Sequence, residues 1–281
     1  MKWEPSEYVS CNLCGRDSTR AWGKKHGMNI VQCRNCGLVY ANPRLNSHQL
    51  DAYYSQTYFE DAQYDGDPQR ARMYEIEIRQ MLKIVGTAGR FLDVGCAYGR
   101  FLSCLPSTFE KQGVEFAAKA AEYAREKFGL DVHRGQLHEV PFEGESVDVV
   151  HFRGVFEHLQ DPQRDLQVAH SILKFGGWLI LSTVPNIAGP CGRLFKTRFK
   201  LVYPQEHIYY FSYRTLRRYC EGNGFVVKHV FYPYLGTPYE NVVADSLAFV
   251  ANYLTGRESP PFFGSVITVY AQKTRQRQPV Q

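Results

Sequence analysis

Four cysteines near the N-terminus have the spacing of metal ligands. Cys11 and Cys14 are separated by two residues, as are Cys33 and Cys36, and eighteen residues lie between the two pairs. This spacing is typical of a tetrahedral zinc site in which four thiolates bind the ion. Because sulfur would fill every ligand position, no position is left for water, and the ion would be structural. We therefore predict a structural zinc ion at these four cysteines, with iron as the alternative ion.

A second stretch, FLDVGCAYGRFL, combines an acidic residue with two glycines after an apolar run. Asp93 would end a buried strand, and Gly95 and Gly99 would let the backbone turn sharply beside a ligand before a helix begins. The free N–H groups at that helix start suit a ligand carboxylate. A dinucleotide-binding loop is the alternative, but Ala97 and Arg100 occupy two of the glycine positions in its G-x-G-x-x-G pattern.

The remaining sequence supplies the elements that would position these residues. The chain has 281 residues and is 44% apolar, which is enough for one sizeable α/β domain and a smaller unit. After residue 89, predicted strands alternate with predicted helices, which is typical of a parallel sheet with helices on both faces. Asp67, Pro68 and Gly86 have the positions of an N-cap, a first helical residue and a terminal glycine. Residues 235–261 are expected to be irregular.

Composition and charge indicate which partners and which cellular location to expect. The net charge of +5 arises from 33 basic and 28 acidic residues, and this mild excess does not by itself imply a nucleic-acid partner. The longest apolar runs are the length of strands, so we expect no membrane partner. The N-terminal residues lack the apolar core of a signal peptide. We therefore expect a cytoplasmic protein, in which reduced cysteines bind metal.

The motifs between residues 91 and 273 resemble those of the class I S-adenosylmethionine-dependent methyltransferases. The glycine loop fits the pattern D-x-G-x-x-x-G, and GVEF, RGQLHEVPF, ESVDVVHFRGVFEHLQDP and LKFGGWLILSTVPN are similar to the family's later strands and turns. The resemblance implies S-adenosylmethionine as the cofactor. It also implies an α/β fold with a seven-stranded, mostly parallel, doubly wound Rossmann-like sheet. We divide the chain into a zinc ribbon (1–45), a helical cap or linker (46–86) and a methyltransferase domain (87–281).

The resemblance further implies roles for individual residues. Glu115 would accept hydrogen bonds from the two ribose hydroxyls, and Phe116 would lie against the adenine. Gln136 replaces the family's usual acid and would accept from the adenine amino group. The complete set predicted to bind the cofactor is Asp93, Gly95, Cys96, Ala97, Gly99, Glu115, Phe116, Gln136, Leu137 and Arg153.

Methyl transfer from a sulfonium is an in-line displacement, and a hydroxyl or amine acceptor also loses a proton. The candidate catalytic residues are Glu157 and His158 in VFEHL and His207 in PQEHIYYFS, a segment that resembles the family's acceptor-pocket segment. A purely structural role for His158 is the alternative. A catalytic metal is disfavoured, because Gly154 stands where a subset of ubiquinone-pathway O-methyltransferases has a glutamate ligand.

The class of methyl acceptor is inferred from the N-terminal segment and from one basic run. The N-terminal segment resembles ribbons fused to methyltransferases of bacterial glycan, sugar and natural-product pathways, where ribbon and tyrosine-rich helices cover the acceptor. We therefore predict O-methylation of a small-molecule or saccharide acceptor. The basic run RLFKTRFK would be either a solvated surface or a clamp for an anionic acceptor. One alternative is an RNA methyltransferase that uses ribbon and basic run to bind the RNA backbone, and another is a binding module without turnover.

Overall fold

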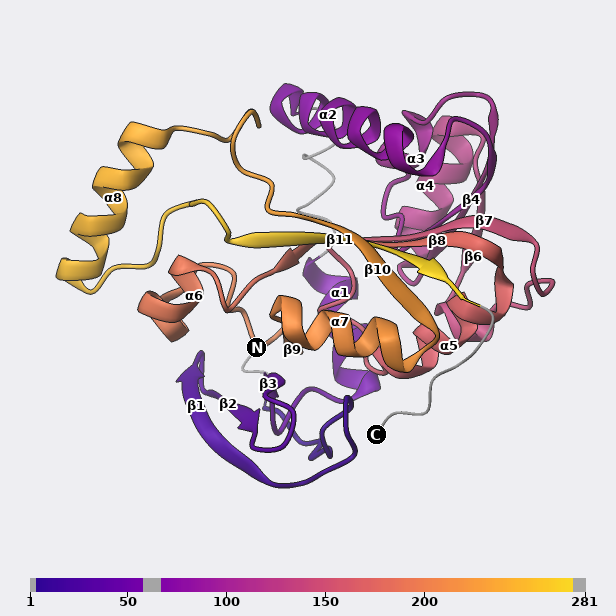
Figure 1. Ribbon diagram of the computed structural model, residues 1–281. Helices are drawn as coiled ribbons and strands as arrows, with labels where there is room; N and C mark the ends of the chain where they lie inside the picture. The colour runs from indigo at the N-terminus through magenta and orange to yellow at the C-terminus, as the bar shows by residue number, and fades with distance from the viewer. Residues whose placement is uncertain (1–3, 58–66, 275–281) are drawn as a thin grey trace.

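The computed structural model describes residues 4–57 and 67–274. A seven-stranded sheet forms its centre, with the strand order β10-β11-β8-β7-β4-β5-β6 (Figure 1). All neighbouring strands are parallel except at β11, which runs antiparallel to both β8 and β10. The predicted seven-stranded, mostly parallel sheet is therefore confirmed. The strands are β4 (Gly89–Val94), β5 (Phe109–Glu115), β6 (Asp131–Arg134), β7 (Val147–Arg153), β8 (Leu173–Pro185), β10 (Phe225–Phe231) and β11 (Val266–Lys273).

Helices cover both faces of this sheet. Phe91 of β4 packs in one apolar cluster with helices on the first face, whereas its neighbour Leu92 packs in a second cluster on the other face. This division follows from the strand geometry, because successive side chains point to opposite sides of a sheet. The first face is covered by α2 (Pro68–Val85), α3 (Arg100–Ser103) and α4 (Ala118–Phe128), and the second by α5 (Pro162–Ile172) and α7 (Tyr213–Gly222).

Helix α2 begins and ends where its sequence indicates. The Asp67 side chain accepts a hydrogen bond from the Gln69 N–H at 2.9 Å, and Pro68 is the first helical residue. At the other end, the Gly86 N–H donates to the Leu82 carbonyl. Local capping chemistry therefore determines the limits of this helix.

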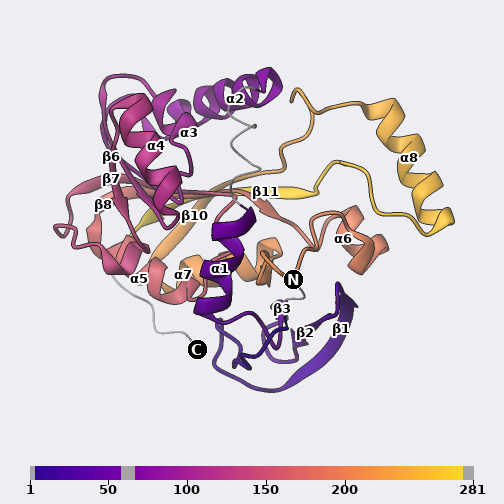
Figure 2. The ribbon, with the colours of Figure 1, turned by 180° about the vertical axis from the view of Figure 1, so that it is seen from behind.

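A second, smaller sheet contains the N-terminal residues (Figure 2). Its strands are β1 (Thr19–Lys25), β2 (Met28–Cys33), β3 (Val39–Ala41) and β9 (Tyr209–Tyr210), in that order. Neither β1 nor β9 was predicted from the sequence. Because Tyr209 and Tyr210 pair with Tyr40 and Val39, the small sheet joins residues of the predicted ribbon to residues of the predicted methyltransferase domain.

The remaining helices are α1 (Ser47–Thr57), α6 (Pro190–Phe195) and α8 (Val242–Thr255). Helix α8 corrects the expectation that residues 235–261 are irregular. Its sequence VVADSLAFVANYLT has no polar stripe of helical period, so the pattern gave no helix signal. The cap residues Asn241 and Gly256 were the local signal that was missed. No helix among the described residues is both long and apolar enough to cross a membrane.

Candidate functional site

A cavity of about 230 Å³ opens at the carboxyl ends of β4, β5 and β7. This is the edge of a doubly wound sheet at which ligands bind. Six of the residues singled out from the sequence line it, and they come from the four connections that follow β4, β5, β6 and β7. They are Gly95, Glu115, Phe116, Gln136, Leu137 and His158.

The turn after β4 requires glycine for two reasons. Gly95 has a φ of +70°, and a Cβ atom at this position would lie 2.5 Å from a methyl carbon of Val155. Gly99 has a φ of +76° and caps α3, where a Cβ atom would collide with Ala124 and Leu130. The backbone therefore turns tightly under the cavity, and any larger side chain would either strain it or displace its neighbours.

Glu115 holds the walls of the cavity together. Its Oε2 accepts from the Ala97 N–H at 2.8 Å and its Oε1 from the Ala117 N–H at 2.7 Å, so one carboxylate joins the turns after β4 and β5. Burial raises the pKa of this carboxyl, and the two N–H donors oppose that rise. Each oxygen keeps a second acceptor site, as a pair of ribose hydroxyls would require.

Asp93 lies beneath the cavity and does not line it. Its Oδ1 is 3.0 Å from Nδ1 of His151, and Nε2 of His151 is 2.7 Å from Oγ of Ser182. The three residues sit on neighbouring strands and face the side covered by α2. Asp93 and His151 are both nearly inaccessible to solvent. The structure thus gives Asp93 a buried polar partner that sequence reasoning did not anticipate.

Arg153 also lies apart from the cavity lining. Its Nε and Nη2 donate to the two carboxylate oxygens of Glu77 at 2.7 and 3.2 Å, and its guanidinium carbon lies 4.6 Å from the centre of the Tyr74 ring. Both contacts are to α2. Cys96 is buried next to Gly113, where a Cβ atom would meet its sulfur at 2.6 Å. Arg153 therefore contacts α2 and Cys96 contacts β5, and neither side chain lines the cavity.

The three candidate catalytic residues come together, and one ring nitrogen or carboxylate oxygen from each lies within 4.8 Å of the others. The rings of His158 and His207 are 4.7 Å apart and nearly perpendicular, and Nε2 of His158 lies 3.9 Å from Oε1 of Glu157. They meet because the Glu157 carbonyl accepts from the N–H groups of Ile208 and Tyr209 at 2.9 and 3.1 Å. Of the three side chains, that of His158 lines the cavity.

Burial controls the charge of this cluster. It lowers the pKa of His158 well below its usual range, with a further contribution from His207, and it lowers the pKa of His207 to about 4. Burial raises the pKa of Glu157 to about 8. Nδ1 of His207 donates to the Leu201 carbonyl at 2.7 Å, so its Nε2 is left as an acceptor. Both imidazoles are therefore neutral near pH 7.

Comparison with known proteins identifies the family. The family described as "Methyltransferase domain" matches residues 67–230, which include every strand of the cavity described above. The chain belongs to this methyltransferase family. The match covers more than half of the chain, and it includes the carboxyl ends of the strands at which the cavity opens.

Solved structures share the fold of this methyltransferase domain. A possible histamine N-methyltransferase from Thermotoga maritima is 23% identical, with a TM-score of 0.57 over 80% of this chain and 99% of that chain. Geranyl diphosphate C-methyltransferase from Streptomyces coelicolor, solved with S-adenosyl-L-homocysteine, is 16% identical, with a TM-score of 0.54 over 71% of this chain and 76% of that chain. These TM-scores show a common fold.

Two curated relatives match shorter regions. An uncharacterized protein of transposon Tn4556 from Streptomyces fradiae is 29% identical over 32% of this chain and 28% of its own length. An uncharacterized protein of Methanocaldococcus jannaschii is 30% identical over 40% of this chain and 52% of its own length. The matched regions thus span about a quarter and about half of these relatives.

Helix α1, which precedes the methyltransferase domain in the sequence, forms part of the cavity wall. Its Ser47 and Leu50 line the cavity, and the Tyr53 hydroxyl donates to Oε1 of Glu206 at 2.5 Å. Glu206 precedes His207, so this bond attaches the helix to the catalytic candidates. Neither Tyr53 nor Glu206 was a site candidate from the sequence. The tyrosine-rich stretch after the ribbon and the acid next to His207 were the available signals.

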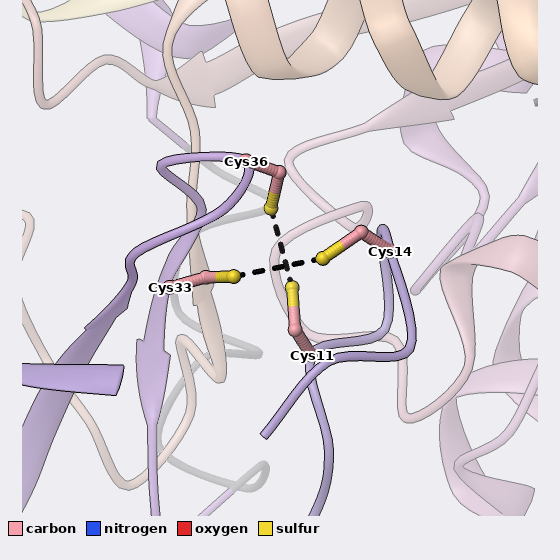
Figure 3. Close-up of side chains that lie close together, drawn as sticks. All are labelled: Cys11, Cys14, Cys33 and Cys36. Carbon is pink, nitrogen blue, oxygen red and sulfur yellow. Dashed lines mark hydrogen bonds between the residues drawn. The ribbon is translucent and has the colours of Figure 1, made fainter. Parts of the chain in front are cut away.

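The four N-terminal cysteines form a compact group of sulfur atoms (Figure 3). Sγ of Cys11 is 3.3 Å from that of Cys36, Sγ of Cys14 is 3.5 Å from that of Cys33, and all four lie within 4.8 Å of one another. Thiolates bound to one zinc ion at about 2.3 Å would be about 3.8 Å apart. The donor set and its spacing therefore fit a tetrahedral ion.

Proposed function

We propose that this chain transfers a methyl group from S-adenosylmethionine to a hydroxyl group of a small-molecule or saccharide acceptor. One observation carries the proposal: three residues predicted to bind the cofactor (Gly95, Glu115 and Gln136) and the candidate base His158 all line the same cavity. Cofactor and acceptor would therefore meet in one cavity.

The cofactor side has groups suited to each part of S-adenosylmethionine. Glu115 presents two carboxylate oxygens for the ribose hydroxyls. Phe116 is 38% exposed beside it and offers an aromatic surface for the adenine. The Gln136 side chain at the cavity wall would accept from the adenine amino group. The glycine turn at Gly95 lets the cofactor approach the backbone closely.

His158 is the proposed base. The acceptor oxygen attacks the methyl carbon, the bond from sulfur to that carbon breaks, and the hydroxyl proton passes to the neutral imidazole of His158. The sulfonium becomes the uncharged thioether of S-adenosylhomocysteine, and the proton later leaves to water. Burial keeps His158 unprotonated near pH 7, and His207 packs against its ring and orients it.

A small acceptor is supported by the surroundings of the cavity. Ser47 and Leu50 of α1 add to its lining, which favours a ligand small enough to fit within it. The tyrosines of the small sheet, Tyr40, Tyr209 and Tyr210, are at most 1% exposed and cannot stack on bases. These two observations favour a small molecule over the RNA alternative.

The cysteine group would hold a structural zinc ion in this proposal. Four thiolates leave no position for water, so the ion would stabilise the small sheet and take no part in methyl transfer. The N–H groups of Gly15 and Gly37 donate to the carbonyls of Cys11 and Cys33 at 2.7 and 3.0 Å, and these bonds close the two turns that present the sulfurs.

A transfer assay tests the proposal. Purified protein is incubated with methyl-labelled S-adenosylmethionine and either a panel of saccharides and small hydroxyl compounds or purified RNA. We expect label in a small acceptor, and loss of turnover by about 10²-fold or more in His158→Ala with unchanged affinity for S-adenosylhomocysteine. Labelled RNA would favour the alternative acceptor. Absence of S-adenosylhomocysteine binding in a calorimetric titration would contradict the proposal altogether.

A further inference from the structure

Helix α8 exposes apolar side chains along its whole length. None of its 14 residues is buried. Val243, Leu247, Val250 and Leu254 are 72%, 69%, 59% and 77% exposed. Their spacing of four, three and four residues places them in one line along the helix. We call these four residues the aliphatic stripe.

The aliphatic stripe points away from the protein. Phe249, on the other side of the helix, packs against the rings of Phe195 and Phe262 at 5.0 and 4.6 Å. Asp245 also faces inward, where its Oδ2 accepts from the Tyr234 hydroxyl at 2.6 Å. Because Asp245 and Phe249 are each two residues from Leu247, they lie about 160° around the helix from it. In Figures 1 and 2, α8 stands at the periphery of the molecule next to α6.

Specific contacts hold the helix in this orientation. The Asn241 side chain accepts from the Ala244 N–H at 3.1 Å and caps the first turn. At the other end, Nη1 of Arg198 donates to the carbonyls of Asn252 and Arg257 at 3.3 and 3.0 Å. A helix capped at both ends and anchored on its inner side is a defined element of the fold, so its outward apolar side needs an explanation.

The surroundings of the aliphatic stripe are basic. The only charged residue in α8 is Asp245, and it is turned toward Tyr234. The neighbouring segment formed by α6 and the 3₁₀ turn Lys196–Arg198 carries Arg193, Lys196 and, just after it, Lys200. All three are exposed, and within the described ranges 4–57 and 67–274 none of them forms an ion pair. An apolar stripe on one helix, together with unpaired cations on the segment packed beside that helix through Phe195 and Phe249, suits a partner that is both apolar and anionic.

We propose that α8 and the basic segment Arg193–Lys200 bind an anionic phospholipid surface. The aliphatic stripe would enter the boundary between headgroups and acyl chains, while Arg193, Lys196 and Lys200 contact phosphates. A helix that lies in the interface needs no membrane-spanning length, which was the basis for expecting no membrane partner. A second copy of the chain suits this surface less well, because pairing two α8 helices would bring two sets of cations together, and the acid that follows the helix, Glu258, is already paired with Lys25.

Vesicle co-sedimentation of the full-length, zinc-containing protein tests this inference. Phosphatidylcholine vesicles are compared with vesicles that also contain phosphatidylglycerol. We expect binding to the anionic vesicles that weakens with added salt. Leu247→Glu and Leu254→Glu should each lower the vesicle affinity about tenfold. Arg193→Gln should lower it about fivefold, since one positive charge near an anionic surface is removed.

Phe175→Glu is the matched control. Phe175 is a 57% exposed aromatic residue near the start of β8, whereas α6 follows the end of that strand, so its vesicle affinity should equal that of the wild type. Affinity for S-adenosylhomocysteine and zinc content should be unchanged in every variant, which separates this inference from the proposed methyl transfer. Absence of binding to anionic vesicles would overturn it. So would a dimer that Leu247→Glu dissociates in protein that binds no vesicles, because a second copy would then cover the stripe.

Discussion

Arg44 donates a hydrogen bond from Nη1 to the Tyr209 hydroxyl at 3.0 Å, and both side chains are buried. The same nitrogen donates to the Gln160 carbonyl at 2.8 Å, and Nε of Arg44 pairs with Glu7 at 2.7 Å. Gln160 lines the cavity, two residues after His158. One arginine at the end of the predicted ribbon therefore holds the small sheet, the N-terminal segment and the wall of the candidate active site together.

Replacing this arginine should loosen the acceptor side of the cavity. Arg44→Met removes bonds to buried acceptors, so we expect the free energy of unfolding to fall by about 2–4 kcal/mol. Hydrogen exchange of residues 157–161 should accelerate, while affinity for S-adenosylhomocysteine changes little. The control is Arg20→Met, which removes an exposed arginine of β1 that bonds to Gln32. Equal effects of the two substitutions would show that Arg44 has no special structural role.

Removing one cysteine should release the proposed zinc ion. We expect about one zinc per chain in the wild type, and none in Cys33→Ser, because three thiolates bind zinc far less tightly than four. The small sheet should lose its protection in hydrogen exchange, since β2 ends at Cys33. Cys104→Ser changes an exposed cysteine outside the group and should retain the ion. Zinc in Cys33→Ser at the wild-type level would mean that the metal is bound elsewhere.

Glu115 should be required for cofactor binding. Glu115→Ala removes the proposed ribose contacts and leaves the N–H groups of Ala97 and Ala117 without their acceptor, so we expect affinity for S-adenosylhomocysteine to fall about 10²-fold. Isothermal titration calorimetry measures this change. Glu110→Ala, at an exposed position on the same strand, should bind as the wild type does. Unchanged affinity in Glu115→Ala would place the ribose elsewhere.

Glu157 should make stability depend on pH. In the unfolded chain it ionises near its usual pKa of 4.5, but burial raises its pKa in the folded protein to about 8. Between these values the folded state retains a proton that the unfolded state has lost, so raising the pH favours unfolding. The stabilising contribution is present below the lower value and is lost as pH rises toward the higher one. Glu157→Gln removes this titration.

The stability difference between wild type and Glu157→Gln should therefore change with pH. Relative to the variant, the wild type should lose about 1.4 kcal/mol of unfolding free energy for each pH unit between about 5 and 8. Urea denaturation at several pH values measures this slope. Glu143→Gln, at an exposed position, serves as the control and should show almost none. A pH-independent difference for Glu157→Gln would mean that the carboxyl is ionised in the folded protein.

Local sequence patterns determined much of this protein. The alternation of apolar runs with capped helices predicted the central sheet. It could do so because the spacing of apolar residues and the cap residues of helices can both be read from short stretches of sequence. The spacing of the two cysteine pairs predicted that their four sulfurs form one group, and the structure brings these sulfurs within 4.8 Å of one another. The glycine turn after Asp93 located the cavity, since ligands bind at that edge of a doubly wound sheet.

Tertiary structure alone decided which distant residues meet. His158 and His207 face each other because the Glu157 carbonyl bonds to the chain that leads into β9, and β9 pairs with the small sheet. No local period encodes such pairing. Arg153 and Glu77 are likewise far apart in the sequence, and only the packing of α2 on the sheet brings them into contact. Helix α8 departs from the sequence patterns because its aliphatic residues face outward, whereas periodicity arguments assume that apolar residues face the core.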